Sequence, residues 1–214
     1  MKTNFAQQIR DKIETAKEGQ IFIHADFANI AGNETVRKNL SRLVENGTIR
    51  RILNGIYEKP KYSFLLKEHV AADPHAVAEA IARNYHWTIA PSGNTALNLL
   101  NLSTQVPSSW SYISDGPYKT YEFNSIKIEF RHRTNKDISK LSFKTQLVIQ
   151  ALKALGKTNI SDNTIKILSA NLSHDEKKTM LWEAKESTDW IYDIIRTISK
   201  GETMNAEHSP STKQ

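Results

Sequence analysis

Basic and polar side chains that can bind nucleic acid gather in one short stretch of this 214-residue chain. Residues 33–61 hold seven Lys or Arg against three Asp or Glu, in a chain whose net charge is +6. Guanidinium and ammonium groups bind phosphate oxygens, and an arginine can also bond guanine O6 and N7 in the major groove. The candidate DNA-binding residues are Arg37, Lys38, Ser41, Arg42, Arg50, Arg51 and Asn54.

A helix and a hairpin are predicted to position these candidates. The helix spans 34–46 with Asn33 as its cap, because its apolar residues recur on one face, namely Val36, Leu40, Leu43 and Val44. The opposite face carries the candidates between residues 37 and 42. After Gly47, β-prone segments 48–52 and 56–57 flank Asn54-Gly55, a strong short-range hairpin signal.

The order of elements in the first sixty residues is that of a winged helix-turn-helix. A helix that ends at Gly19 precedes the β-prone run 21–23, and Asp26 is predicted to cap a brief helix that extends to Ala31. The alternative is an ordinary amphipathic helix with a solvated charged face. The adjacent basic hairpin favours DNA binding over that alternative.

The whole chain is predicted to be an α+β protein. Residues 1–62 form the winged helix-turn-helix domain, and residues 63–200 form a mixed α/β domain with a small sheet and C-terminal helices. Residues 201–214 are polar and lack periodicity, which predicts a disordered tail. In the second domain, helices are expected over 74–84 and 142–155, a capping box at 173–176, and strands over 87–90, 110–113, 118–123 and 126–130.

Signals of catalysis are weak. Ser92-Gly93, between a predicted strand and a helix, lacks both the G-x-S-x-G elbow and a Gly-rich loop with Lys, so Ser92 is interpreted as a turn serine that caps the helix. His24 and Asp26 could supply two metal ligands, but Asp26 is better explained as a helix cap. We therefore expect no catalytic residues, metal or cofactor, and no enzyme activity.

The amino-acid composition indicates which classes of protein are compatible with this sequence. Hydrophobic residues make up 39% of the chain and charged residues 24%, which is typical of a water-soluble fold. No apolar run reaches the ~18 residues of a membrane span, and no signal peptide is evident. Cysteine is absent, which excludes disulfides and thiolate chemistry. A cytoplasmic protein without a membrane partner is expected; the oligomeric state is not indicated.

Three segments carry a family resemblance. Residues 36–57 (VRKNLSRLVENGTIRRILNGIY) resemble the N-terminal domain of AbiEi-family antitoxins and related transcriptional regulators. Residues 86–107 (HWTIAPSGNTALNLLNLSTQVP) and 112–117 (YISDGP) resemble the domain that follows in the same proteins. The resemblance covers about residues 1–157.

The resemblance implies a type IV antitoxin that also represses its own operon. The winged helix would bind double-stranded operator DNA, and the next domain would counter a nucleotidyltransferase-like toxin, with or without direct contact. The resemblance implies a DNA-binding role for Arg37, Lys38, Arg42, Arg50 and Arg51. It implies no particular residue for neutralisation of the toxin. The alternative function is a winged-helix module that binds a protein or RNA without operator-specific repression.

Overall fold

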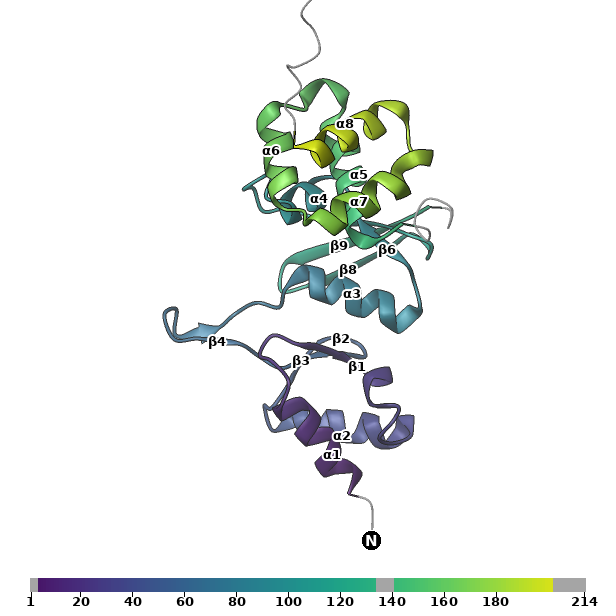
Figure 1. The fold of residues 1–214 in the computed structure, drawn as a ribbon. Helices are drawn as coiled ribbons and strands as arrows, with labels where there is room; N and C mark the ends of the chain where they lie inside the picture. The colour runs from purple at the N-terminus through teal and green to yellow at the C-terminus, as the bar shows by residue number, and fades with distance from the viewer. Residues whose placement is uncertain (1–3, 134–140, 202–214) are drawn as a thin grey trace, which may run out of the picture. The chain divides into compact units, whose positions relative to one another are not determined.

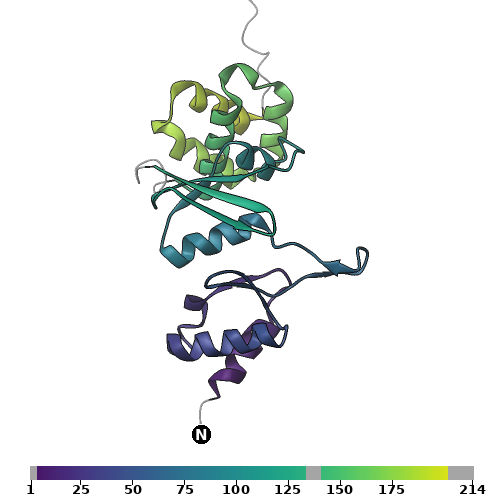
Figure 2. The same ribbon diagram turned by 180° about the vertical axis from the view of Figure 1, so that it is seen from behind.

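The computed structural model describes residues 4–133 and 141–201 and has a mixed α+β architecture with small sheets, as predicted at that level (Figures 1 and 2). The chain divides into two compact units. The first holds residues 1–87 and 121–128, and the second holds residues 88–120 and those from 129 onward. No helix in the described ranges is both long and apolar enough to cross a membrane. The predicted tail lies, apart from Gly201, outside the described residues.

The first unit begins with helices that pack on a three-stranded antiparallel sheet of order β1-β3-β2. Apolar residues from both helices and the sheet form one buried cluster, which includes Ile9, Phe22, Leu40 and Tyr57. The elements up to residue 58 are α1 (Phe5–Glu14), β1 (Ile21–Ile23), η1 (His24–Phe27, a 3-10 helix), α2 (Asn33–Glu45), β2 (Arg50–Leu53) and β3 (Ile56–Glu58).

Two predicted caps in this unit are wrong. Helix α2 is capped by Gly32, with no side-chain hydrogen bond, and Asn33 is already its first helical residue. Asp26 lies inside η1 instead of before it, and its carboxylate accepts a hydrogen bond of 2.8 Å from the backbone N–H of Ile23. The Asp26 side chain still accepts from a backbone amide at the start of a helix, that of Ile23, but it does so from a position inside η1.

A short hairpin that the sequence did not predict follows β3. Strands β4 (Tyr62–Ser63) and β5 (Glu68–His69) pair antiparallel, and Figure 1 shows them extending away from the β1-β3-β2 sheet. The side chains at the tip, Phe64 and Leu65, are 88% and 92% exposed. None of the tip residues belongs to the buried cluster of the unit.

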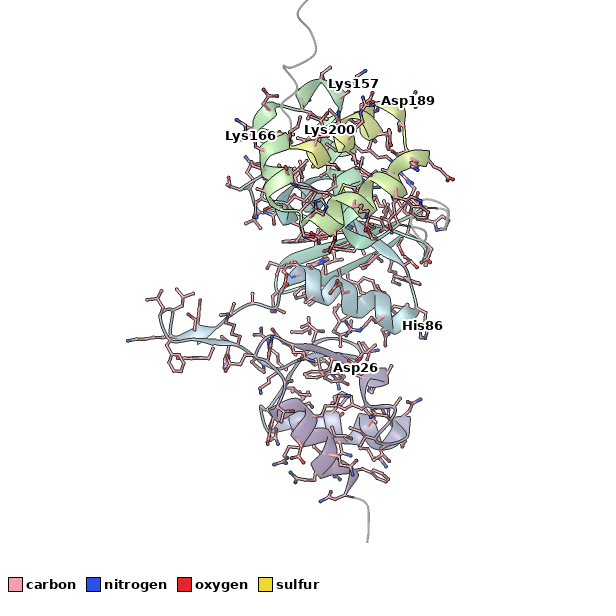
Figure 3. The ribbon with its side chains drawn as sticks, viewed as in Figure 1. Asp26, His86, Lys157, Lys166, Asp189 and Lys200 are labelled. Carbon is pink, nitrogen blue, oxygen red and sulfur yellow. The ribbon has the colours of Figure 1, made fainter. Side chains whose placement is uncertain are left out.

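Helix α3 (Pro74–Tyr85) is the last helix of the first unit. It starts as predicted, with the Asp73 carboxylate accepting from the His75 amide and proline at the first helical position. The helix packs against β1, and Arg83 forms an ion pair of 3.6 Å with Asp26, which Figure 3 labels. Because α3 packs on β1, the first unit extends past residue 62, which is the predicted end of the N-terminal domain. Whether residues 1–62 fold independently stays a prediction.

The second unit combines strands with five α-helices and two 3-10 helices (η3 and η4) among its described residues. The four-stranded sheet has the order β6-β7-β9-β8, and the boundary between the units runs through β8 and β9. Apolar residues from the helices form a second buried cluster, which includes Leu152, Leu168, Met180 and Ile195. The elements are β6 (Ile89–Pro91), α4 (Asn94–Leu99), β7 (Trp110–Ser114), β8 (Lys119–Phe123), β9 (Ile126–His132), α5 (Phe143–Leu155), η3 (Lys157–Asn159), α6 (Asp162–Ala170), α7 (His174–Glu183), η4 (Ala184–Glu186) and α8 (Asp189–Lys200).

Helix caps in the second unit test the sequence predictions directly. The capping box is confirmed, because Ser173 and Glu176 each accept a hydrogen bond from the other's backbone amide. The interpretation of Ser92 as a cap is wrong. Helix α4 is capped by Gly93 at a φ of +56°, without any side-chain hydrogen bond.

Candidate nucleic-acid interface

Helix α2 and the β2–β3 hairpin together line one surface hollow, of about 540 Å³, in the first unit. It contains six of the seven predicted DNA-binding residues; only Arg50 does not line it. Three further side chains complete the lining. The nine residues are His24, Arg37, Lys38, Ser41, Arg42, Glu45, Arg51, Asn54 and Tyr57.

The helical contribution follows from the 3.6-residue period of α2. Val36, Leu40 and Leu43 face the buried cluster. The polar positions 37, 38, 41, 42 and 45 are then spaced by three or four residues on the other side, so their side chains lie above one another. Arg42 is exposed and makes no ion pair with any described residue. The same surface therefore presents several polar groups over two turns.

The hairpin contribution is set by its register. Arg51 pairs with Tyr57 across the strands, and its guanidinium lies 5.5 Å from the centre of the tyrosine ring. Gly55 in the turn has a φ of +77°, and a Cβ there would lie 3.7 Å from His24 Nδ1. The turn thus packs closely over His24, with Asn54 exposed at its tip.

Arg50 departs from the predicted set. Its Nε donates to Glu58, and its Nη2 donates to the carbonyl oxygen of Val70 at 2.5 Å. The Glu58 side chain is only 2% exposed. Consecutive residues of a strand point to opposite faces, so Arg50 and Arg51 cannot both line the hollow. The Arg50 guanidinium binds groups of the protein itself, which the sequence analysis did not foresee.

The lining is strongly positive. Among the described residues that line the hollow, four cationic side chains face one carboxylate, that of Glu45, which gives a net charge of +3 with His24 neutral. Glu34, outside the hollow, forms ion pairs with Arg37 at 3.1 Å and with Lys38 at 3.5 Å. The hydrogen bond from Arg37 and the two positive charges lower the pKa of Glu34. These exposed ion pairs contribute little to stability, so phosphate groups can compete for both cations.

His24 is the buried polar group of this surface. Its Nε2 is buried and has no hydrogen-bond partner among the described residues, and its ring packs edge-on against Tyr57, with centroids 5.7 Å apart. Burial lowers the pKa of His24, and the charges of Arg37 and Arg51 lower it further. No local sequence pattern indicates His24, because folding brings it to lining residues that lie at least 13 positions further along the chain.

We expect the chain to lose stability as the pH falls from 6.5 through the lowered pKa of His24. The unfolded chain, with the ordinary histidine pKa, takes up the proton first, so acidification favours unfolding. Melting temperatures measured between about pH 7.5 and 5 should depend less on pH in His24→Gln than in the wild type. Glu34 and Glu176, whose pKa values lie below 4.5, titrate outside this window.

The exposed His174 on α7 provides the matched control for this experiment. His174→Gln should retain the wild-type dependence of melting temperature on pH. An unchanged dependence in His24→Gln would contradict the assignment to His24.

The part of the chain that the structure describes contains no group of side chains that could bind a metal ion. No three or more His, Asp or Glu side chains there are grouped so that they could hold a metal ion. The side chains of His24 and Asp26, considered as two ligands from the sequence, are engaged separately. Asp26 bonds Ile23 and Arg83, whereas His24 packs on Tyr57.

Comparisons with known proteins place the sequence in a family. No curated protein matches it. Among solved structures, the crystal structure of the RV2827C protein from Mycobacterium tuberculosis is similar, with 11% sequence identity and a TM-score of 0.44 over 92% of this chain and 78% of that one. Residues 8–181 match a family described as a family of unknown function, DUF6088, and the chain therefore belongs to that family.

Proposed function

We propose that the first unit is a winged helix-turn-helix that binds duplex DNA, with α2 as the recognition helix. The observation that carries the proposal is the positive hollow that α2 and the β2–β3 hairpin line together. An ordinary solvated helix face does not require a hairpin to add a cation and an amide to the same surface. The order α1, β1, η1, α2, β2, β3 supports the same proposal.

In this proposal α2 lies in the major groove and the hairpin contacts the DNA backbone. Arg42 and Ser41 are placed to reach base edges, because they lie on the exposed face of α2. Arg51 and Asn54 contact phosphates or the adjacent minor groove. Arg50 is removed from the contact set, since its guanidinium is bonded to Glu58 and Val70.

The resulting set contains three cations for phosphate contacts, Arg37, Lys38 and Arg51, because Arg42 is assigned to base edges. The logarithm of the association constant should then fall against the logarithm of salt concentration with a slope of about −2.7. Removing one contact in Arg51→Ala should reduce the slope to about −1.8 and weaken binding to all sequences. Fluorescence anisotropy of the full chain with a duplex from its own promoter, titrated with salt, measures both quantities.

Lys17 is the matched control, because it is an exposed cation of the same unit outside the hollow. Lys17→Ala should bind the duplex with the wild-type slope. Wild-type binding that does not respond to salt would refute the electrostatic interface, as would equal changes of slope in the two variants.

We further propose that this DNA binding represses the operon of a type IV toxin–antitoxin system, with the second unit as the antitoxin part. Support for this half comes from the resemblance of residues 36–57, 86–107 and 112–117 to AbiEi-family antitoxins. An adjacent reading frame for a nucleotidyltransferase-like protein would favour it. The absence of such a frame would favour a winged-helix module that binds protein or RNA.

A further inference from the structure

A second hollow, of about 760 Å³, lies entirely within the second unit. Four parts of the chain form its wall: the turn between β6 and α4, the segment that leads into β7, the end of β9, and one face of α5. Its volume lies within the range of about 300–1,000 Å³ that is typical of small-molecule sites. None of its residues lines the hollow on α2 and the hairpin.

Cations dominate the charged side chains of this second hollow. Glu129 and Arg131 alternate along the end of β9, and Arg133 directly follows the strand at the next alternate position, while Phe130 is buried. Lys153 on α5 adds a third positive charge. Arg131 forms an ion pair of 3.2 Å with Glu129, which is the single carboxylate among the described residues of the lining. Three cations against one carboxylate give these described residues a net charge of +2, which favours an anion.

Small hydroxyl side chains supply hydrogen-bond donors beside these cations. Ser92, Ser108, Ser109 and Ser111 all line the hollow. The Ser109 Oγ is buried and has no hydrogen-bond partner among the described residues. Buried hydroxyls nearly always have a partner, so this Oγ–H is an unused donor beside the hollow. Ser92 is not used as the cap of α4, which has Gly93 in that position.

The backbone around the serines is held in place. The Ser111 amide donates to Thr95 Oγ1 at 2.7 Å, and the Ser92 amide donates to the Ser111 carbonyl at 2.9 Å. Thr95 itself is fully buried. These bonds join the β6–α4 turn and the start of α4 to β7, so this part of the serine wall exists before a ligand binds.

We propose that this hollow binds a small phosphorylated ligand, whose phosphate is held by Arg131, Arg133, Lys153 and the Ser109 hydroxyl. Guanidinium and hydroxyl groups are common partners of phosphate oxygens. A terminal phosphate can enter a concave site, and a change of the Ser109 rotamer would then bring its Oγ to the phosphate. A phosphate in a DNA duplex stays on the surface of the double helix, which favours a small ligand over nucleic acid here.

Isothermal titration of the full chain tests the proposal with inorganic phosphate, adenosine 5′-monophosphate and adenosine, all at one ionic strength set with chloride. Both phosphate probes should bind and adenosine should not. Ser109→Ala and Arg133→Gln should each weaken phosphate binding about tenfold, because each loses a hydrogen bond to a charged group. Lys166→Gln, which removes an exposed cation of α6 outside the hollow, should bind like the wild type (Figure 3).

The relative affinities of the two phosphate probes distinguish an organic phosphate from free phosphate as the ligand. Tighter binding of the nucleotide supports an organic phosphate as ligand, whereas equal affinities support free phosphate in the same site. The proposal is overturned if neither phosphate probe binds, if Lys166→Gln loses as much affinity as Arg133→Gln, or if duplex DNA displaces the bound phosphate. Melting curves without ligand check the folding of Ser109→Ala; a variant that folds normally and keeps full affinity also overturns the proposal.

Discussion

Replacing Arg50 with alanine is expected to lower the free energy of unfolding by about 3 kcal/mol. The substitution leaves the Glu58 carboxylate buried, at 2% exposure, without its ion-pair partner. Removing one partner of a buried pair costs about 3–5 kcal/mol, and the lower end applies because the Arg50 side chain is 27% exposed. The Val70 carbonyl also loses a hydrogen bond. Urea denaturation of the full chain, followed by circular dichroism, measures the loss.

Arg51→Ala is the matched control for this substitution, because it removes the neighbouring arginine from the other face of β2. Its guanidinium is exposed over Tyr57, so its unfolding free energy should change by less than about 1 kcal/mol. The double variant Arg50→Met with Glu58→Leu should recover most of the stability, since it leaves no unpaired buried charge. A stable Arg50→Ala variant would refute a structural role for the ion pair.

Replacing Arg42 with alanine is expected to reduce discrimination between operator and scrambled duplex by roughly 1–3 kcal/mol. This corresponds to about 5- to 150-fold in the ratio of the two affinities. Arg42 lies one turn after Lys38 on the exposed face of α2 and makes no ion pair with any described residue. Its guanidinium can therefore take both acceptors of a guanine edge without first breaking an ion pair.

Arg42→Lys separates charge from shape in the same experiment. Lysine restores the positive charge but not the planar fork, so it should recover affinity for scrambled duplex more than specificity for the operator. Titration of each variant against both duplexes at one salt concentration gives the ratio. Equal losses of affinity for both duplexes would show that Arg42 contacts phosphate. No loss of affinity for either duplex would show that Arg42 is a solvated residue that does not contact DNA.

Periodic patterns predicted the elements of the candidate interface well. Helix α2 and the Asn54-Gly55 hairpin occur within two residues of the predicted positions, because their apolar repeats and turn residues act over short distances. The structure also groups six of the seven predicted residues. Arg50 lies outside this group for a reason that can be read from the sequence. Two consecutive arginines on a strand must face opposite sides, and only one can share a surface with α2.

The apolar repeats and turn residues could not predict contacts between distant segments of the chain. His24 and Tyr57 line the interface through the packing of η1 and β3, which no local repeat encodes. The caps predicted at Asn33 and Ser92 failed because glycine takes the capping position before α2 and α4. Glycine is acceptable at a helix start, so a nearby polar residue is not decisive. Arg131, Arg133 and Lys153 meet only after β9 and α5 have packed in the second unit.

The β4–β5 hairpin gives the chain a place where its length can change. Phe64, Leu65 and Leu66 at the tip are all exposed and contribute nothing to the buried clusters on either side of them in the sequence. Segments of this kind accept inserted residues, because no buried contact or sheet pairing is displaced. A tag, a fluorescent label or an entire inserted domain placed at Leu65 would leave the Arg50–Glu58 pair and the α2 surface intact. In other members of the family, this tip is where differences in chain length should concentrate.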